Sequence, residues 1–283
     1  ATSLNRADTL QRQGGYPSPP GSPSDIPGLE FAGVVLETGD RVIGMAKGDR
    51  VFGLLGGGGY ASRIITHHRM AIPIPDDWDF VQAAATPEVY FTAYDALFNR
   101  ANLQMGETVL VHAAGSGVGT AAIQVAKNIV GATVIATTSN EEKARKAREL
   151  GADSVINYTQ EDIAARVKEL TGGRGVDVVV DHVGSEFWPA ASASLARGGR
   201  YGICGVTTGY RADLQMGRMF LQSQTIFGTY MGRKADLTQI VQMADKGIIR
   251  GIVHGTFPLK NAAEAHRVME ERSFFGKLVL TIK

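Results

Sequence analysis

Three glycines follow an apolar run in the middle of the chain, and this spacing could hold a dinucleotide. The run covers residues 109–112, and the glycines are Gly115, Gly117 and Gly119. A strand, a glycine turn and a helix start let the backbone approach a pyrophosphate, which free N–H groups and the helix dipole attract. Thr120 stands where the strict G-x-G-x-x-G pattern would have its last glycine. An ordinary strand–helix turn is therefore the alternative reading.

The segments around this turn alternate between strand and helix patterns. Strands are expected at residues 109–112, 133–139, 154–158, 176–181, 200–205 and 225–230, and helices at 120–127, 141–150, 162–170 and 188–196. Such alternation predicts an α/β fold with a doubly wound parallel sheet. A ligand of this fold binds at the carboxyl ends of the strands, where the glycine turn is expected.

The two flanking regions have a different pattern. Several prolines break up the first 30 residues, and short β segments with glycine turns follow at residues 30–37, 50–55 and 60–66. Short strands at close spacing predict a small, partly open β-barrel. After residue 230 the pattern predicts helix, strand, helix and strand at residues 237–246, 252–257, 262–272 and 277–282. We expect this tail to return to the first domain and leave a cleft beside the nucleotide domain.

Composition excludes several classes of protein. The 283 residues carry a net charge of +1, so no basic field for nucleic acid is expected. No apolar run reaches membrane-spanning length and no signal peptide is visible, so we expect no membrane association and a cytoplasmic location. Cys204 is the one cysteine, which excludes a disulfide framework and a four-cysteine zinc site.

Several motifs together resemble the medium-chain dehydrogenase/reductase superfamily. They are LNRADTLQRQGGYP, PGLEFAGVV, KGDRVFGLLGGGGYA, TAYDALF, GETVLVHAAGSGVGTAAIQVAK, LGADSVINY, GGRGVDVVVDHVG and FGKLVL. More narrowly, they are similar to its zinc-free quinone oxidoreductase branch, which includes zeta-crystallin. The resemblance implies a GroES-like catalytic domain at residues 1–91, without its first strands, and a six-stranded Rossmann domain at residues 92–230. Residues 231–283 would then return to the catalytic domain.

The residues also bear on a catalytic zinc. Zinc-dependent relatives carry an early cysteine ligand and a Gly-His-Glu segment, where this chain has Gly28-Leu29-Glu30 and no cysteine before Cys204. A catalytic zinc needs three Cys, His or carboxylate ligands, and leucine cannot be one. His67 and His68 are neighbours that would face opposite ways on a strand. We therefore expect no metal site.

The end of the second central strand indicates the cofactor. An NAD site usually places an acid there, but residues 136–139 contain none, and Lys143 follows within one helical turn. The resemblance implies that Ser139, Lys143, Tyr158 and Arg272 surround the 2′-phosphate of NADPH. The alternative is that Lys143 lies on a solvated helix face beside two glutamates.

The resemblance also suggests residues for the reacting end of the cofactor. Asn5 and Tyr16 would act on the substrate carbonyl or its developing oxyanion, and Thr92 would contact the nicotinamide. Alternatively, Tyr16 is a packed turn residue and Thr92 a helix cap. The remaining cofactor contacts are expected from Gly115, Ser116, Gly117, Val118, Gly119, Val183, Gly205 and Phe227.

These inferences predict an enzyme that transfers hydride from NADPH to a small-molecule quinone or another conjugated carbonyl (enone). The alternatives are an enoyl thioester (enoyl-CoA type) reductase and a low-turnover NADPH-binding protein like a lens crystallin. The sixth strand, residues 225–230, is rich in β-branched and aromatic residues. An exposed edge strand of this kind invites pairing, so we expect a homodimer.

Overall fold

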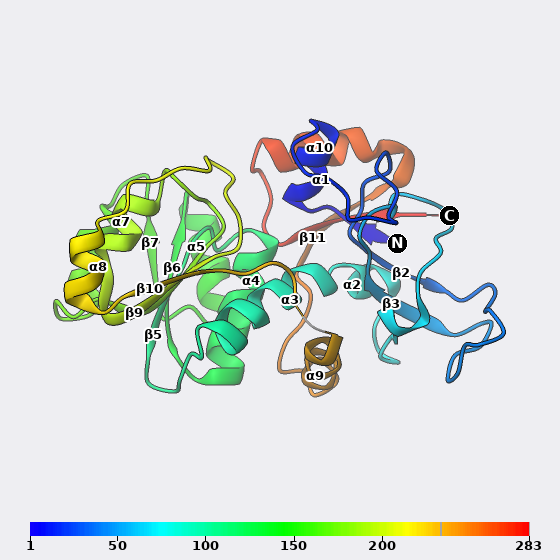
Figure 1. The fold of residues 1–283 in the computed structure, drawn as a ribbon, viewed down its shortest axis with the longest axis horizontal. Helices are drawn as coiled ribbons and strands as arrows, with labels where there is room; N and C mark the ends of the chain where they lie inside the picture. The colour runs from blue at the N-terminus through cyan, green and yellow to red at the C-terminus, as the bar shows by residue number, and fades with distance from the viewer. Residues whose placement is uncertain (233, 283) are drawn as a thin grey trace. The chain divides into compact units, whose positions relative to one another are not determined.

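A six-stranded sheet carries the glycine-rich turn (Figure 1). In spatial order its strands are β10 (Thr225–Gly228), β9 (Leu195–Ile203), β8 (Val176–Asp181), β5 (Thr108–Val111), β6 (Thr133–Thr138) and β7 (Ser154–Asn157). Every neighbouring pair is parallel. The central strands β5 and β8 are apolar and almost entirely buried, as expected where helices cover both faces. The predicted doubly wound parallel sheet is confirmed.

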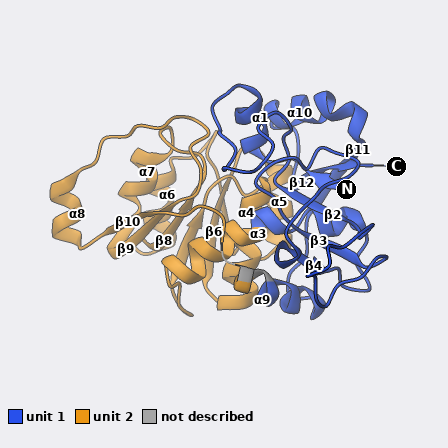
Figure 2. Cartoon of the chain, turned by 45° about the vertical axis from the view of Figure 1, so that its right-hand side comes forward, with its two compact units in different colours: residues 1–89, 237–283 blue, residues 90–236 orange. Residues whose placement is uncertain are grey.

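The structure is a computed structural model that describes residues 1–232 and 234–282. The chain divides into two units, coloured separately in Figure 2. Unit 1 comprises residues 1–89 and 237–283, and unit 2 comprises residues 90–236. Unit 2 is therefore a continuous segment, whereas unit 1 is assembled from two.

The helices of unit 2 follow its strands. They are α4 (Gly117–Gln124), α5 (Glu141–Glu149), α6 (Ile163–Leu170), α7 (Trp188–Ala193) and α8 (Met216–Gln222), with π-helical segments at Asp95–Arg100 and Val125–Val130. The helix predicted at residues 188–196 ends earlier, because Leu195 already pairs with Val176 as the first residue of β9. Helix α8 was not predicted.

Unit 1 contains two small sheets. One has the order β1 (Thr2–Ser3), β12 (Lys277–Thr281) and β11 (Val253–Pro258), and the other the order β2 (Glu30–Val34), β3 (Arg50–Leu54) and β4 (Ala71–Pro73). The strand predicted at residues 60–66 is wrong. The Tyr60 amide instead donates to the Pro27 carbonyl, and β4 takes the place beside β3.

The sequence analysis did not predict the helices of the first 94 residues. They are α1 (Arg6–Arg12), α2 (Phe80–Ala84) and α3 (Pro87–Tyr94), of which α3 crosses the boundary between the units. The later helices α9 (Lys234–Asp245) and α10 (Ala262–Glu270) lie close to their predicted positions. Among the described residues, no helix combines the length and apolar character that a bilayer crossing requires.

Candidate functional site

The turn between β5 and α4 is built for close approach to its backbone. Ser116 is the N-cap of α4, and its Oγ accepts a hydrogen bond from the Gly119 amide at 2.9 Å. A Cβ on Gly119 would collide with the Ala113 carbonyl oxygen and lie 2.9 Å from Ala114 Cα. The amides of Gly117 and Val118 lie in the first helical turn, where no intrahelical acceptor exists. The turn therefore offers N–H groups and a positive dipole end to an anion.

A histidine from the next strand reaches this turn. His182 follows β8, and its Nε2 lies 2.7 Å from Ser116 Oγ. Its Nδ1 is buried and has no hydrogen-bond partner among the described residues. Burial lowers the pKa of His182, against the opposing effects of the Asp181 charge and the Ala113 backbone. The sequence analysis did not foresee this contact, because 66 residues separate Ser116 from His182.

Asp181 fixes the loop in which His182 lies. Its Oδ1 accepts from the amides of Val183 and Gly184 at 2.7 and 3.1 Å, and its Oδ2 accepts from the Tyr201 hydroxyl at 2.7 Å. The side chain is 1% exposed. Asp181 is thus a structural carboxylate whose hydrogen bonds hold the backbone after β8.

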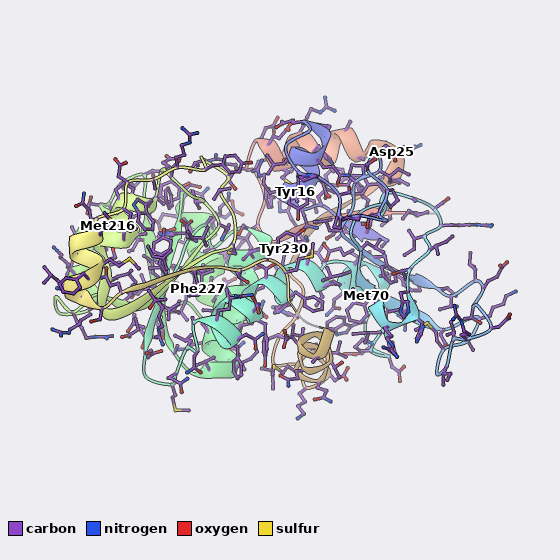
Figure 3. The ribbon with its side chains drawn as sticks, in the orientation of Figure 1. Tyr16, Asp25, Met70, Met216, Phe227 and Tyr230 are labelled. Carbon is purple, nitrogen blue, oxygen red and sulfur yellow. The ribbon has the colours of Figure 1, made fainter. Side chains whose placement is uncertain are left out.

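Three predicted cofactor residues lie at the neighbouring strand ends. A Cβ on Gly205 would lie 3.0 Å from the His182 carbonyl oxygen, so this glycine allows close packing of two loops. The Val183 side chain belongs to the core, and its carbonyl accepts from Thr208. Phe227 lies on β10 (Figure 3) and its ring packs over Gly202.

Three of the four residues predicted for a 2′-phosphate follow the ends of β6 and β7, whereas Arg272 belongs to unit 1. The Tyr158 amide donates to the Thr138 carbonyl at 3.1 Å, which brings Tyr158 beside Ser139. Asn140 caps α5 by accepting from the Lys143 amide at 2.9 Å, so Lys143 lies in the first turn of that helix. Ser139, Lys143 and Tyr158 are all partly accessible.

The glutamates at the start of α5 do not enclose this group. Glu141 is exposed, and Glu142 forms an ion pair with Lys146 at 2.7 Å, one turn further along the helix. No acidic residue occupies positions 136–139. The end of β6 is therefore compatible with a phosphate and lacks the carboxylate that would bind a ribose 2′-hydroxyl.

His112 lies fully buried at the end of β5. Its Nδ1 is 3.2 Å from Thr137 Oγ1, and its ring meets Phe187 edge-on at a centroid distance of 5.0 Å. Its Nε2 finds no partner among the described residues. Burial lowers the pKa of His112 to about 4, so the imidazole is neutral at physiological pH. It is a packed core histidine.

In unit 1, Asn5 belongs to a buried polar cluster. Lys277 Nζ lies 2.9 Å from Glu30 Oε1, and the two side chains are 3% and 0% exposed. Asn5 Nδ2 donates to Glu30 Oε1 at 2.9 Å, while its Oδ1 accepts from Lys277 at 2.5 Å. Glu30 also accepts from Ser3 Oγ and the Glu88 amide. One Asn5 amide hydrogen is thus used within unit 1, and the sequence analysis did not foresee Lys277 in this cluster.

The other predicted residues lie in separate elements. Tyr16 lies in a bend after α1 of unit 1 and is partly buried (Figure 3). Thr92 belongs to unit 2 and is 4% exposed in the middle of α3, so it is not the N-terminal cap of that helix. Arg272 follows α10 in unit 1 with a φ of 58°, and its charge lowers the pKa of Arg6.

The residues that the sequence analysis weighed as zinc ligands are not grouped around a common point. Leu29 is 1% exposed and Glu30 is paired with Lys277. The rings of His67 and His68 stack at 4.6 Å, so the prediction that they face opposite ways is wrong. His68 begins a 3-10 helix rather than continuing a strand. Within residues 1–232 and 234–282, no three His, Cys, Asp or Glu side chains are grouped to hold a metal ion.

Known proteins resemble both units. Residues 1–76 match the family described as "Alcohol dehydrogenase GroES-like domain", and residues 117–246 match "Zinc-binding dehydrogenase". The bovine (Bos taurus) "Quinone oxidoreductase-like protein 2" is 37% identical over 289 residues, covering 99% of this chain and 82% of the relative.

Two solved structures show the same fold. An "NAD-dependent alcohol dehydrogenase" superposes with a TM-score of 0.93 at 36% identity, over 100% of this chain and 90% of the other. The Escherichia coli quinone oxidoreductase complexed with NADPH gives 0.88 at 34% identity, over 99% and 89%.

Proposed function

Because this chain belongs to the quinone oxidoreductase family of the medium-chain dehydrogenases/reductases, we propose that it is a zinc-independent reductase that uses NADPH. Its acceptor is a quinone or another conjugated carbonyl compound. The observation that carries the cofactor assignment is the end of β6, where Ser139, Lys143 and Tyr158 gather without an acid. This combination supplies a cation and hydroxyl donors to a 2′-phosphate.

The glycine turn fits the pyrophosphate of such a cofactor. Gly119 leaves the space that a Cβ would fill beside Ala113, and Ser116 caps the helix without blocking its first amides. Gly115, Gly117 and Val118 contribute backbone in the same turn. The NADPH complex of the E. coli relative, 34% identical, supports this use of the fold.

Bound NADPH supplies the hydride, and the protein's part is binding, orientation and stabilisation of charge. A quinone or enone accepts hydride at carbon, and the developing oxyanion needs a hydrogen-bond donor. In this proposal Tyr16 and the second Asn5 amide hydrogen are the donors of unit 1. Thr92 contacts the nicotinamide, and Arg272 adds positive charge for the phosphate. The ion pair of Glu30 with Lys277 and the leucine at position 29 support a reaction without zinc.

The test of the cofactor assignment is charge reversal at Lys143. Lys143→Glu should weaken NADPH binding about 10- to 150-fold, the worth of a charge-assisted hydrogen bond, and should change NADH binding by less than about threefold. Lys146→Glu is the matched control, because it makes the same charge change one turn further along the same helix. Titrations of cofactor fluorescence measure both. Equal losses for NADPH and NADH would contradict the phosphate assignment.

The acceptor is tested by NADPH oxidation. We expect turnover with 1,4-benzoquinone or 9,10-phenanthrenequinone to exceed turnover with crotonyl-CoA. Faster reduction of crotonyl-CoA would instead identify an enoyl thioester reductase. Tight NADPH binding without consumption of any of the three would identify a low-turnover binding protein.

A homodimer through β10 is part of the proposal. Within the part of the chain that the structure describes, β10 is the last strand of its sheet and pairs with β9 alone. Helix α8 precedes it and exposes Met216, Phe220 and Leu221 by 74%, 79% and 65% (Met216 in Figure 3). We expect Phe220→Glu/Leu221→Glu to convert a dimer to a monomer in light scattering after size exclusion. A wild-type monomer would refute the dimer.

A further inference from the structure

The contact between Ser116 and His182 raises a question of proton placement. Ser116 Oγ accepts from the Gly119 amide at 2.9 Å and lies 2.7 Å from His182 Nε2. A hydroxyl has one proton to donate. If Nε2 carries no proton, the Ser116 hydroxyl donates to it. If Nε2 is protonated, Ser116 accepts from it and the hydroxyl proton is available to another group.

An anion at the start of α4 favours the second arrangement. The first-turn amides and the helix dipole already attract negative charge there. A serine whose proton is used by His182 would present only lone pairs to that anion, which would be repulsive. A serine that accepts from both Gly119 and His182 would instead donate to it. Asp181 does not compete for Nε2, because its carboxylate oxygens are occupied by Val183, Gly184 and Tyr201.

We propose that His182 is a positioning residue of the pyrophosphate turn: when the dinucleotide binds, Nε2 of His182 donates to Ser116 Oγ and frees the Ser116 hydroxyl for a phosphate oxygen. The inference rests on the proposed function for its ligand and deepens it by adding a residue. The buried Nδ1 without a partner is consistent with a ring that can move its proton between nitrogens. Nε2 contacts Ser116 Oγ, and Nδ1 has no side-chain partner among the described residues.

Binding titrations test this coupling. We expect His182→Phe to weaken both NADPH and NADH about tenfold, because the two share the pyrophosphate. His182→Gln keeps an N–H donor and should restore most of the affinity. Ser116→Gly removes the hydroxyl but leaves a tolerated N-cap. In the Ser116→Gly background His182→Phe should have no further effect. Independent, additive losses, or wild-type affinity in His182→Phe, would overturn the proposal.

A spectroscopic readout separates positioning from a general structural role. Nitrogen-15 NMR of histidine-labelled protein should show Nε2 of His182 protonated in the complex with NADPH, and His182→Gln identifies its signal. A complex in which Nε2 carries no proton would overturn the proposal.

The same titrations distinguish the two failures. If the wild type binds NADH but not NADPH, and His182→Phe weakens NADH binding, the NADPH assignment is refuted and this inference stands. If the wild type binds NADPH and His182→Phe binds it equally tightly, only this inference is refuted. If neither dinucleotide binds, both fall.

Discussion

Removing the buried ammonium of Lys277 should destabilise unit 1 severely. Lys277→Met keeps the length of the side chain but leaves the Glu30 carboxylate, which is 0% exposed, without its counter-charge. Breaking a buried ion pair from one side costs about 3–5 kcal/mol, because an uncompensated charge remains. Domains typically have only about 5–15 kcal/mol of stability. The variant should therefore lose about a fifth or more of its free energy of unfolding.

The two tryptophans allow each unit to be followed by itself. Trp78 lies in unit 1 and Trp188 in unit 2, and the chain has no third. In a Trp188→Phe background, the fluorescence of Trp78 during urea unfolding reports unit 1. Trp78 is 3% exposed, so its emission should shift strongly when that unit opens.

A matched control and a double variant make the reasoning falsifiable. Lys127 pairs with Asp153 at 2.6 Å, but these side chains are 38% and 36% exposed. Lys127→Met, followed by Trp188 in a Trp78→Phe background, should cost only about 0–1 kcal/mol. Glu30→Gln added to Lys277→Met should recover part of the loss, since no buried charge is then unpaired. The reasoning is refuted if Lys277→Met loses no more free energy of unfolding than Lys127→Met does, each measured against its own single-tryptophan background.

Two further predictions concern unit 2. The folded pKa of His112, about 4, lies below its unfolded value of 6.5, so unfolded chains take up protons first as pH falls. This contributes about 3 kcal/mol of stability above pH 6.5, and that contribution is lost between pH 6.5 and about 4. His112→Leu should flatten the resulting slope when the free energy of unfolding is measured against pH. Gly119→Ala should weaken NADPH and NADH binding alike by at least about tenfold, because its Cβ would displace the Ala113 carbonyl; unchanged titrations of cofactor fluorescence would contradict this.

The sequence predicted unit 2 better than unit 1 for a physical reason. Its central strands β5 and β8 are largely apolar and buried, and glycine or an N-cap residue marks many helix ends, as Asn140 does for α5. The strands of unit 1 are short, and its glycine-rich segment before Tyr60, residues 56–59, donates hydrogen bonds to Ile26 and Gly28 instead of joining a ladder. The sequence analysis therefore predicted a strand at residues 60–66 that does not form, and it did not predict α1.

The same distinction holds for the candidate site. The family resemblance grouped Ser139, Lys143 and Tyr158 in advance, and the parallel pairing of β6 with β7 brings together the strand ends that carry Ser139 and Tyr158. The surroundings of Asn5 could not, since Lys277 is 272 residues away in the chain. The contact of His182 with Ser116, 66 residues apart, likewise depends on the order of β5 and β8 in the sheet.

The division of unit 1 into two segments has a consequence for biosynthesis. β1 pairs with β12, and Lys277 completes the charge cluster around Glu30, so the ribosome must translate the distal segment before that cluster can close. Residues 90–236 are contiguous and can fold while synthesis continues. Until the distal segment emerges from the ribosome, Glu30 and Asn5 lack their contacts with the Lys277 ammonium. A nascent chain would thus complete unit 2 first and unit 1 last.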